Sequence, residues 1–396
     1  MLLIAIVLGG ATALLAATLV GAGLARAGFP LPEPRRRIGE VDGLRGYLAL
    51  FVMVHHLALW VWMTRLEAPW GGTPATLLNH FGSGAVALFF MATGLVFYPR
   101  VLEGGRATAW RRLVVARVFR IVPLTAVSVL AVALIVLGET GGRVTPAFVI
   151  DLMKWVTGWH QVDLLGFAHT SRINAGVLWS LWYEWVFYLA LLPLCAFAMD
   201  AVRARGWPTV ALPVGALGVT LVASWATGAS VTHLRLVQVM PLFAMGMLAF
   251  ECRAVPRVAD VLARPRVGGY ALALLLLAVL STGDPYGWAL PAYALVFACV
   301  ACGNRLGVLA SAGARVLGEC SFGVYLLHGM VLWLTFTRVP LAGVPTLWLP
   351  ALLPILAVTA VLVAAAAHLV IERPMIALGR RVAQWRRSPR LVEAVG

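Results

Sequence analysis

Charged side chains are scarce in this chain. Asp, Glu, Lys and Arg make up only 12% of its 396 residues, whereas hydrophobic residues make up 61%, and the mean hydropathy is +0.91. Ordinary soluble domains carry about 25% charged residues. The composition therefore excludes an ordinary soluble protein and predicts a polytopic membrane protein. At about 20 residues per span, with short loops, the length allows ten or so membrane spans in one bundle.

The first apolar run, residues 2–24, has no basic residue before it, and arginines follow it at positions 26 and 35–37. A secretory signal peptide begins with a positively charged segment, which this run lacks. We therefore expect a membrane span whose N-terminus lies outside and whose following arginines lie in the cytoplasm.

Cysteines are few and poorly placed for chemistry. The chain has five, and all lie in or beside apolar runs. Cys299 and Cys302 have the spacing of a redox motif, but they occupy an apolar helix with no second pair nearby. They are typical of small apolar core residues, so neither a disulfide nor a metal site is expected.

The net charge of +15 comes from basic residues in the gaps between apolar runs. The preference of Lys and Arg for cytoplasmic loops explains this pattern better than nucleic-acid binding does. The expected partner is thus the lipid bilayer, and nucleic acid is not expected as a partner.

The apolar runs predict an all-α polytopic fold with about eleven spans. Their approximate ranges are 2–24, 46–64, 80–99, 122–138, from 177 onward, 209–228, 235–250, 268–281, 287–302, a run around 318–328, and 349–371. The region 148–175 is only moderately apolar, and a span there would send Arg203 and Arg205 outside. A re-entrant or interfacial segment is therefore preferred.

The stretch from Ile38 to His56 carries the clearest functional pattern. Arg45 and His56 are separated by almost three helical turns, so they share one face, about 16 Å apart along the axis. With Arg45 at a membrane surface, His56 lies near the middle of a hydrocarbon layer about 30 Å thick. Ionisable groups at that depth usually mark functional sites. The alternative is an arginine that marks a helix end and a histidine bonded to a neighbouring helix.

Arg117 and Arg120 lie one helical turn apart in the most basic gap of the chain. Guanidinium groups in this arrangement suit phosphate recognition, although the same charge also serves topology. Glu184 lies roughly 12 Å from the outer end of its span, the depth expected for His56. A carboxylate and an imidazole at one level could form an acid/base pair.

Ser321, Tyr325 and His328 follow i, i+4, i+7 spacing, so they share one helix face. His328 also lies near mid-depth. Such a polar stripe either lines a site or bonds to neighbouring helices.

Six motifs in order give the chain a family resemblance. They are Asp42-Gly-Leu-Arg-Gly with His56 at R-x10-H spacing, Phe89-Phe-Met-Ala-Thr-Gly94, Arg117-Val-Phe-Arg-Ile-Val-Pro123, Trp179-Ser-Leu-Trp-Tyr-Glu184 with Phe187-Tyr188, Ser321-Phe-Gly-Val-Tyr-Leu-Leu-His328, and Glu372-Arg-Pro374. From about residue 38 to 374 the chain resembles the acyltransferase-3 family of integral membrane O-acyltransferases, which modify bacterial surface sugars and some secreted natural products. It departs from the family at Ala87, where an acidic residue is common, and at Thr93, where serine is usual.

The resemblance implies a ten-helix acyltransferase bundle with one extra N-terminal span. The corresponding divisions are residues 1–37 for that helix and its linker, 38–376 for the acyltransferase domain, and 377–396 for a basic cytoplasmic tail. The implied location is the bacterial inner membrane. The implied reaction moves an acyl group, acetyl in particular, from cytoplasmic acyl-CoA to a hydroxyl of a cell-surface or exported glycan. A small natural product is an alternative acceptor, a separate extracytoplasmic transferase is a candidate partner, and no bound cofactor is implied.

For the site, we expect His56 to act as general base, because an imidazole with an ordinary pKa of about 6.5 can take a hydroxyl proton near neutral pH. A covalent acyl-histidine is a less favoured alternative. Arg45, Arg117 and Arg120 are expected to hold the CoA phosphates or the pantetheine arm, and Glu184 to orient the imidazole or the acceptor. The expected lining residues of the substrate cavity are Thr93, Ser321, Tyr325 and His328.

Two other classes remain open. A proton-coupled transporter or flippase also uses histidine and glutamate within the membrane. A noncatalytic membrane scaffold poorly explains three ionisable groups at mid-depth.

Overall fold

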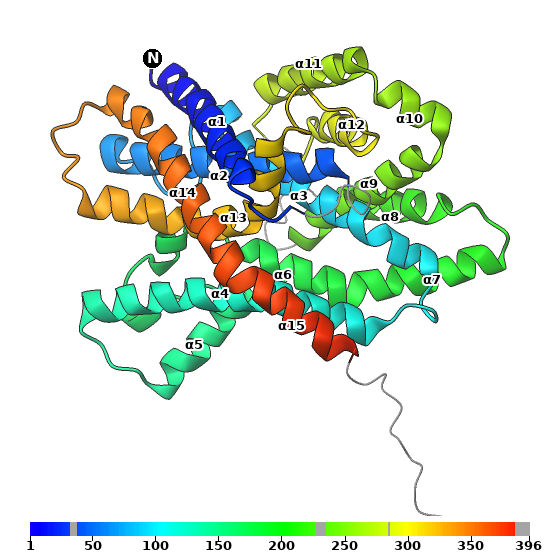
Figure 1. Cartoon of the computed structure of the whole chain (residues 1–396), viewed down its shortest axis with the longest axis horizontal. Helices are drawn as coiled ribbons and strands as arrows, with labels where there is room; N and C mark the ends of the chain where they lie inside the picture. Colours follow the sequence, from blue (N-terminus) through cyan, green and yellow to red (C-terminus); the bar gives the residue numbers. More distant parts are fainter. Residues whose placement is uncertain (32–37, 227–234, 284–285, 385–396) are drawn as a thin grey trace, which may run out of the picture.

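The computed structural model describes residues 1–31, 38–226, 235–283 and 286–384. Within these ranges the chain is built of helices and contains no β-strand (Figure 1). The α-helices are α1 Leu2–Arg26, α2 Gly39–Leu66, α3 Thr76–Glu103, α4 Trp110–Thr140, α5 Pro146–Thr157, α6 Trp179–Val186, α7 Leu192–Ala204, α8 Ala211–Ala226, α9 Arg235–Ala254, α10 Pro256–Leu262, α11 Pro265–Ser281, α12 Leu290–Ala301, α13 Ala312–Arg338, α14 Leu353–Ala367 and α15 Arg373–Gln384. The 3-10 helices are η2 Leu164–Gly166, η3 Thr170–Asn174 and η5 Thr346–Leu352, and the π-helices are η4 Phe187–Leu191 and η6 His368–Glu372.

Seven helical segments of the described chain are long and apolar enough to cross a membrane. They are α1, α2, α3, α4, α13, the continuous segment Trp179–Ala204 and the continuous segment Thr346–Gln384. The other four expected spans correspond to α9, which bends by 109° into α10, and to the shorter helices α8, α11 and α12. The all-α, multi-pass architecture is confirmed, and the count of eleven spans stays a prediction.

The region 148–175 forms no long helix. Helix α5 has 12 residues, and η2 and η3 that follow it have three and five. At about 1.5 Å per residue, none of these pieces can cross a hydrocarbon layer of about 30 Å. Their lengths agree with the prediction of a re-entrant or interfacial segment.

The two ends of the predicted domain are only partly described. Helix α15 continues to Gln384, so the first residues of the expected tail 377–396 are helical. Residues 385–396 of that tail and residues 32–37 of the expected linker lie outside the described ranges.

Helices α2 and α13 pack together at the centre of the bundle, and glycines set their separation. A Cβ atom on Gly46 would lie 2.5 Å from the Cβ of Leu317, and one on Gly318 would lie 2.3 Å from the carbonyl oxygen of Asp42. Small residues allow this close approach between membrane helices. The contact brings the polar positions of α2 toward those of α13.

Many large apolar side chains face outward. On α1 they include Leu15, which is 61% exposed, and on α11 they include Leu277, which is 66% exposed. On a soluble protein, continuous apolar surfaces of this kind promote association. Around a membrane bundle they are the surface that contacts lipid.

Candidate functional site

Two histidines from the central helices contact each other. Nδ1 of His56 on α2 lies 2.9 Å from Nε2 of His328 on α13, and the rings are stacked with centroids 5.1 Å apart. His328 is fully buried. The R-x10-H spacing and the i, i+4, i+7 stripe therefore converge on one hydrogen bond.

The partners of this pair define its proton positions. Nδ1 of His328 lies 3.0 Å from the carbonyl oxygen of Val324, which can only accept, so this nitrogen carries the proton. Nε2 of a neutral His328 is then an acceptor, and Nδ1 of His56 must donate to it. A neutral His56 is left with a lone pair on its own Nε2. A nitrogen in that state can act as a base.

One side of His56 is covered by an aromatic ring from the loop between α2 and α3. Trp70 stacks on His56 at 6.2 Å with an interplanar angle of 13°. The guanidinium of Arg172, from η3, lies 5.9 Å from the centre of the Trp70 ring. Both Trp70 and Arg172 belong to segments for which the positive-inside pattern predicts the outer side of the membrane.

A small cavity of about 50 Å³ lies between α2, α3, α6 and α13. It is lined by Arg45, Ser180, Glu184, Ser321 and Tyr325, among others. The hydroxyl of Tyr325 shares a 2.9 Å hydrogen bond with that of Ser180. The Tyr325 ring lies 6.3 Å from the His328 ring, so this middle cavity adjoins the pair.

The hydroxyl of Ser321 differs from that of Ser180 in the middle cavity, because it makes no hydrogen bond within the described chain. Ser321 is fully buried, and its Oγ has no hydrogen-bond partner among the described residues. A buried hydroxyl without a partner is unfavourable, and here it is available to a ligand.

A second cavity, of about 100 Å³, shares Arg45 and Glu184 with the middle one. Its lining adds Thr93, Arg117 and Arg120. This arginine cavity thus gathers all three arginines that the sequence assigns to phosphate binding. The two cavities are neighbours between α2, α3, α4, α6 and α13, and Tyr325 of the middle cavity is the lining residue that also contacts the ring of His328.

Arg117 and Arg120 of α4 are each held by neighbouring groups. The guanidinium of Arg117 lies 5.0 Å from the centre of the Phe97 ring and 5.8 Å from that of Tyr188. Arg120 forms a 2.9 Å ion pair with Glu372, whose side chain is fully buried. Tyr188 belongs to π-helix η4 and Glu372 to π-helix η6. Such turns are rare and often lie at functional sites.

The profile of the acyltransferase-3 family, described as an acyltransferase domain, matches residues 38–369. The chain belongs to the acyltransferase-3 family. The match contains the histidine pair and the lining residues of both cavities, and α1 lies before it. No curated protein and no solved structure matches the chain significantly.

For this acyltransferase-3 protein, the structure places the expected residues in two groups. His56 and His328 form the pair, and Tyr325 adjoins it. A longer set lines the cavities, namely Arg45, Thr93, Arg117, Arg120, Glu184 and Ser321. The hydroxyl of Thr93 donates to the carbonyl of Phe89 in its own helix at 3.1 Å.

Glu184 lies with the arginines. Its carboxylate accepts a 3.0 Å hydrogen bond from the hydroxyl of Tyr188, and it lines both cavities with Arg45. The partner that contacts His56 is His328, rather than the carboxylate expected from depth alone. Glu184 therefore faces the Arg45 end of α2, whereas His328 faces His56 farther along the same helix.

Four contributing residues were not among those expected from the sequence. Trp70 stacks on His56, Arg172 contacts Trp70, and Ser180 and Tyr188 line the cavities. Ser180 and Tyr188 belong to family motifs, whereas Trp70 lies in a loop and Arg172 in the short 3-10 helix η3, where no periodicity marks either residue. Within the described ranges, no three His, Cys, Asp or Glu side chains are grouped so that they could hold a metal ion.

Proposed function

We propose that this membrane acyltransferase is an O-acyltransferase of the bacterial cytoplasmic membrane. It transfers an acyl group, acetyl in particular, from cytoplasmic acyl-CoA to a hydroxyl of a cell-surface or exported glycan. The observation that carries the proposal is the hydrogen-bonded pair of His56 and His328, which lies between the arginine side of the bundle and the Trp70 side. This placement suits a donor and an acceptor that approach one base from opposite ends.

The arginine cavity is the binding site for the donor. Arg117 and Arg120 lie in the most basic gap between two apolar runs, which the positive-inside rule assigns to the cytoplasm. Their guanidinium groups suit the phosphates of CoA, and the middle cavity, which shares Arg45 and Glu184 with the arginine cavity, is available to the pantetheine arm. The thioester then lies in the middle cavity, near Ser321 and the histidine pair.

The acceptor end is the face of His56 covered by Trp70. Aromatic rings provide apolar contact area with a polar edge, and Arg172 adds a hydrogen-bond donor beside this ring. A sugar hydroxyl that reaches Nε2 of His56 from this end needs no route past the arginines. The same chemistry accommodates a small natural product as acceptor.

The chemical step is an acyl transfer in which His56 is the base. Nε2 of His56 takes the proton from the acceptor hydroxyl as that oxygen attacks the thioester carbonyl carbon. The C–S bond then breaks, the ester remains on the acceptor, and the imidazolium returns its proton to the CoA thiolate. His328 is a positioning residue, since its Nε2 accepts the hydrogen bond from Nδ1–H of His56 and so fixes the basic tautomer.

Charge also develops on the thioester oxygen during attack, and a donor aimed at it lowers the barrier. The hydroxyl of Ser321 is free for this role. The hydroxyl of Tyr325 is less suited, because it already contacts Ser180 and the carbonyl of Val177.

The experiment that tests the proposal uses purified protein in lipid vesicles with radiolabelled acetyl-CoA and a panel of glycan and small-molecule acceptors. Wild type is compared with His56→Ala and with the control His160→Gln, a histidine on the exposed outer segment. Removing a general base costs about 10²–10⁴-fold in rate.

We expect ester-linked label on one acceptor, its loss in His56→Ala, and wild-type transfer by His160→Gln. Full transfer by a folded His56→Ala protein would contradict the role of His56 as general base. Proton-coupled transport by wild type without CoA turnover would show that the protein is a carrier rather than an enzyme.

A further inference from the structure

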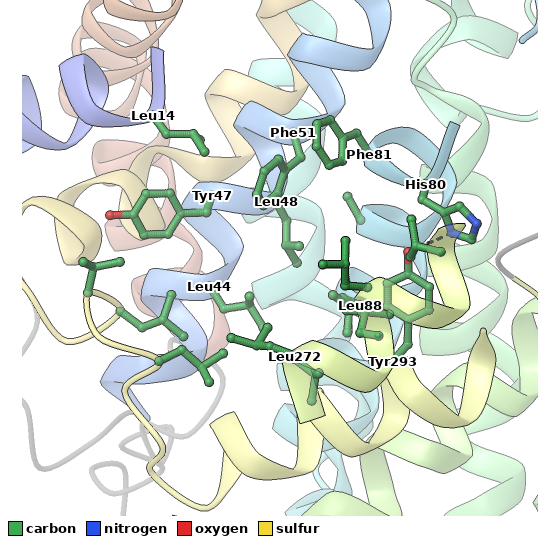
Figure 2. Close-up of a pocket in the computed structure, with 18 of the residues that line it drawn as sticks. Leu14, Leu44, Tyr47, Leu48, Phe51, His80, Phe81, Leu88, Leu272 and Tyr293 are labelled. Carbon is green, nitrogen blue, oxygen red and sulfur yellow. Dashed lines mark hydrogen bonds between the residues drawn. The ribbon is translucent and has the colours of Figure 1, made fainter. Parts of the chain in front are cut away.

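A third and much larger cavity, of about 560 Å³, lies between α1, α2, α3, α11 and α12. It uses different faces of α2 and α3 from those that face the arginines. Leu44 and Leu88 line it, whereas the adjacent residues Arg45 and Phe89 line the middle and arginine cavities. Figure 2 shows side chains from these helices arranged around the open space. We call it the lateral cavity.

The polar side chains of the lateral cavity already have partners within the protein. The hydroxyls of Thr18 and Tyr47 share a 2.9 Å hydrogen bond. Nδ1 of His80 lies 2.9 Å from the hydroxyl of Tyr293, the dashed contact in Figure 2, and its Nε2 lies 2.7 Å from the carbonyl oxygen of Thr282. The remaining lining residues are Leu, Val, Phe and Ala. The cavity therefore offers a ligand apolar contact and few hydrogen bonds, which favours hydrocarbon over a sugar or a headgroup.

The lateral cavity is elongated along the helices. On α3 its lining extends from Leu77 to Leu88, which corresponds to about 16 Å of helix at about 1.5 Å per residue. The hydrocarbon layer of a bilayer is about 30 Å thick, so one leaflet provides about half of that. The length of the cavity thus fits one hydrocarbon chain of one leaflet.

The cavity continues into the surface that faces the bilayer. Its lining includes Leu15, Leu272 and Leu276, which are 61%, 42% and 54% exposed. These side chains belong to α1 and α11, the helices that also expose leucines to lipid. A lipid hydrocarbon chain can therefore enter the cavity sideways from the bilayer. Water does not fill such a space well, because empty apolar cavities stay dry.

We infer that the lateral cavity binds one acyl chain of a bilayer phospholipid. The acyl chain fills a space in which the lining side chains otherwise have no atoms to contact. It also connects α1, which lies outside the family match, to α11 and α12 within it. This site is separate from the acyl-transfer residues, and its occupancy does not depend on which acceptor the enzyme uses.

The test uses the full chain in vesicles of phosphatidylcholine that carries a photoreactive diazirine within one acyl chain. After illumination, peptide mass spectrometry locates the adducts. We expect them to concentrate on buried lining residues such as Leu44, Leu48 and Leu88, which are 7%, 2% and 5% exposed.

Ala85 is a lining residue that is 3% exposed, so Ala85→Phe places a ring in the cavity. We expect adducts on the buried leucines to fall at least about tenfold, equivalent to about 1.4 kcal/mol of affinity. The control Leu277→Phe changes an exposed residue of α11 outside the lining and should leave the adducts unchanged. Val279→Phe, on the opposite wall, gives a second filled variant if Ala85→Phe fails to fold.

Adducts confined to exposed leucines would contradict binding in the lateral cavity. Adducts that are unchanged in both Ala85→Phe and Val279→Phe would contradict it as well. Loss of the phospholipid adducts when a polyprenyl phosphate is added would overturn the phospholipid as occupant. Because the readout is labelling rather than acyl transfer, failure of this inference is distinguishable from failure of the proposed function.

Discussion

Nδ1 of His56 and Nε2 of His328 lie 2.9 Å apart, although 272 residues separate them in the chain. The bond depends on the close packing of α2 against α13 and on the Val324 carbonyl, which fixes the proton of His328. It makes one nitrogen of His56 a donor to His328 and leaves the other free to accept a proton. The pair is therefore the structural basis for a base at the centre of the bundle.

The first prediction separates positioning from packing at His328. His328→Leu removes the side-chain acceptor that holds the Nδ1 proton of His56, so the basic tautomer of His56 is less firmly fixed. We expect kcat to fall about 10²-fold, within the range of general-base effects, with the KM for acetyl-CoA unchanged. His328→Gln restores an acceptor oxygen and should recover part of the loss. Equal rates for His328→Leu and wild type would contradict the positioning role.

The second prediction compares two buried serines. The hydroxyls of Ser321 and Ser128 are both fully buried and without a hydrogen-bond partner among the described residues, but only Ser321 lines the middle cavity. We expect Ser321→Ala to lower kcat about 10²-fold, as the loss of one oxyanion donor does. Ser128→Ala should keep wild-type kcat. Equal kcat values for the two variants in a steady-state assay would remove Ser321 from the reaction.

The third prediction concerns recognition of CoA by Arg117. Replacing it in Arg117→Gln removes a charge-assisted contact, which is worth about 1.5–3 kcal/mol. We expect the KM for acetyl-CoA to rise at least about tenfold. The KM for acetyl-pantetheine, which lacks the phosphates, should not change. Arg112→Gln, an exposed position of the same helix, is the control, and a rise in KM for both donors would argue against phosphate binding.

Helical periodicity explains what the sequence predicts correctly. Apolar runs identify most helices, because a membrane span requires about 20 apolar residues. The spacing of Ser321, Tyr325 and His328 places them on one face of α13, and the structure brings that face to the site. Arg45, Arg117 and Arg120 likewise meet in one cavity, and the sequence predicts all three at the cytoplasmic ends of their spans.

Rotation between helices and loop conformation explain what the sequence does not predict. The depth expected from the sequence makes Glu184 and His328 equally good candidates for the partner of His56. Only the packing of α2 on α13 shows that His328 is the partner. Trp70 and Arg172 lie in segments without periodicity, so their positions follow from tertiary contacts. The lateral cavity depends on the gap between five helices, which no local pattern encodes.

The fourth prediction concerns the ion pair of Arg120 and Glu372. The side chain of Glu372 is fully buried and that of Arg120 is 19% exposed, so Glu372→Ala leaves a largely buried charge without its partner. We expect the free energy of unfolding in detergent micelles to fall by about 3 kcal/mol. Removing both charges in Arg120→Met with Glu372→Leu should recover part of this loss.

The matched control for that pair is Glu103→Ala. Glu103 pairs with Arg100 at the surface, where the side chains are 40% and 55% exposed. Exposed pairs contribute at most about 1 kcal/mol. Similar losses for Glu103→Ala and Glu372→Ala would contradict a special contribution from burial.

The fifth prediction connects the packing of α2 on α13 to the chemistry. In Gly46→Ala the new methyl group would lie 2.5 Å from the Cβ of Leu317, so the two helices must separate. Overpacking of this kind costs about 1–3 kcal/mol. The same separation lengthens the hydrogen bond between His56 and His328, so we expect stability and kcat to fall together.

Gly39→Ala on the same helix supplies the control, because no atom lies within 4 Å of the position a Cβ would occupy there. Alanine is the better helix former, so stability should stay equal or rise by up to about 1 kcal/mol. Unfolding in detergent and steady-state acyl transfer should be measured on both variants. If Gly46→Ala lost stability but kept wild-type kcat, the histidine pair would tolerate separation of its helices, and its geometry could not be what sets the rate.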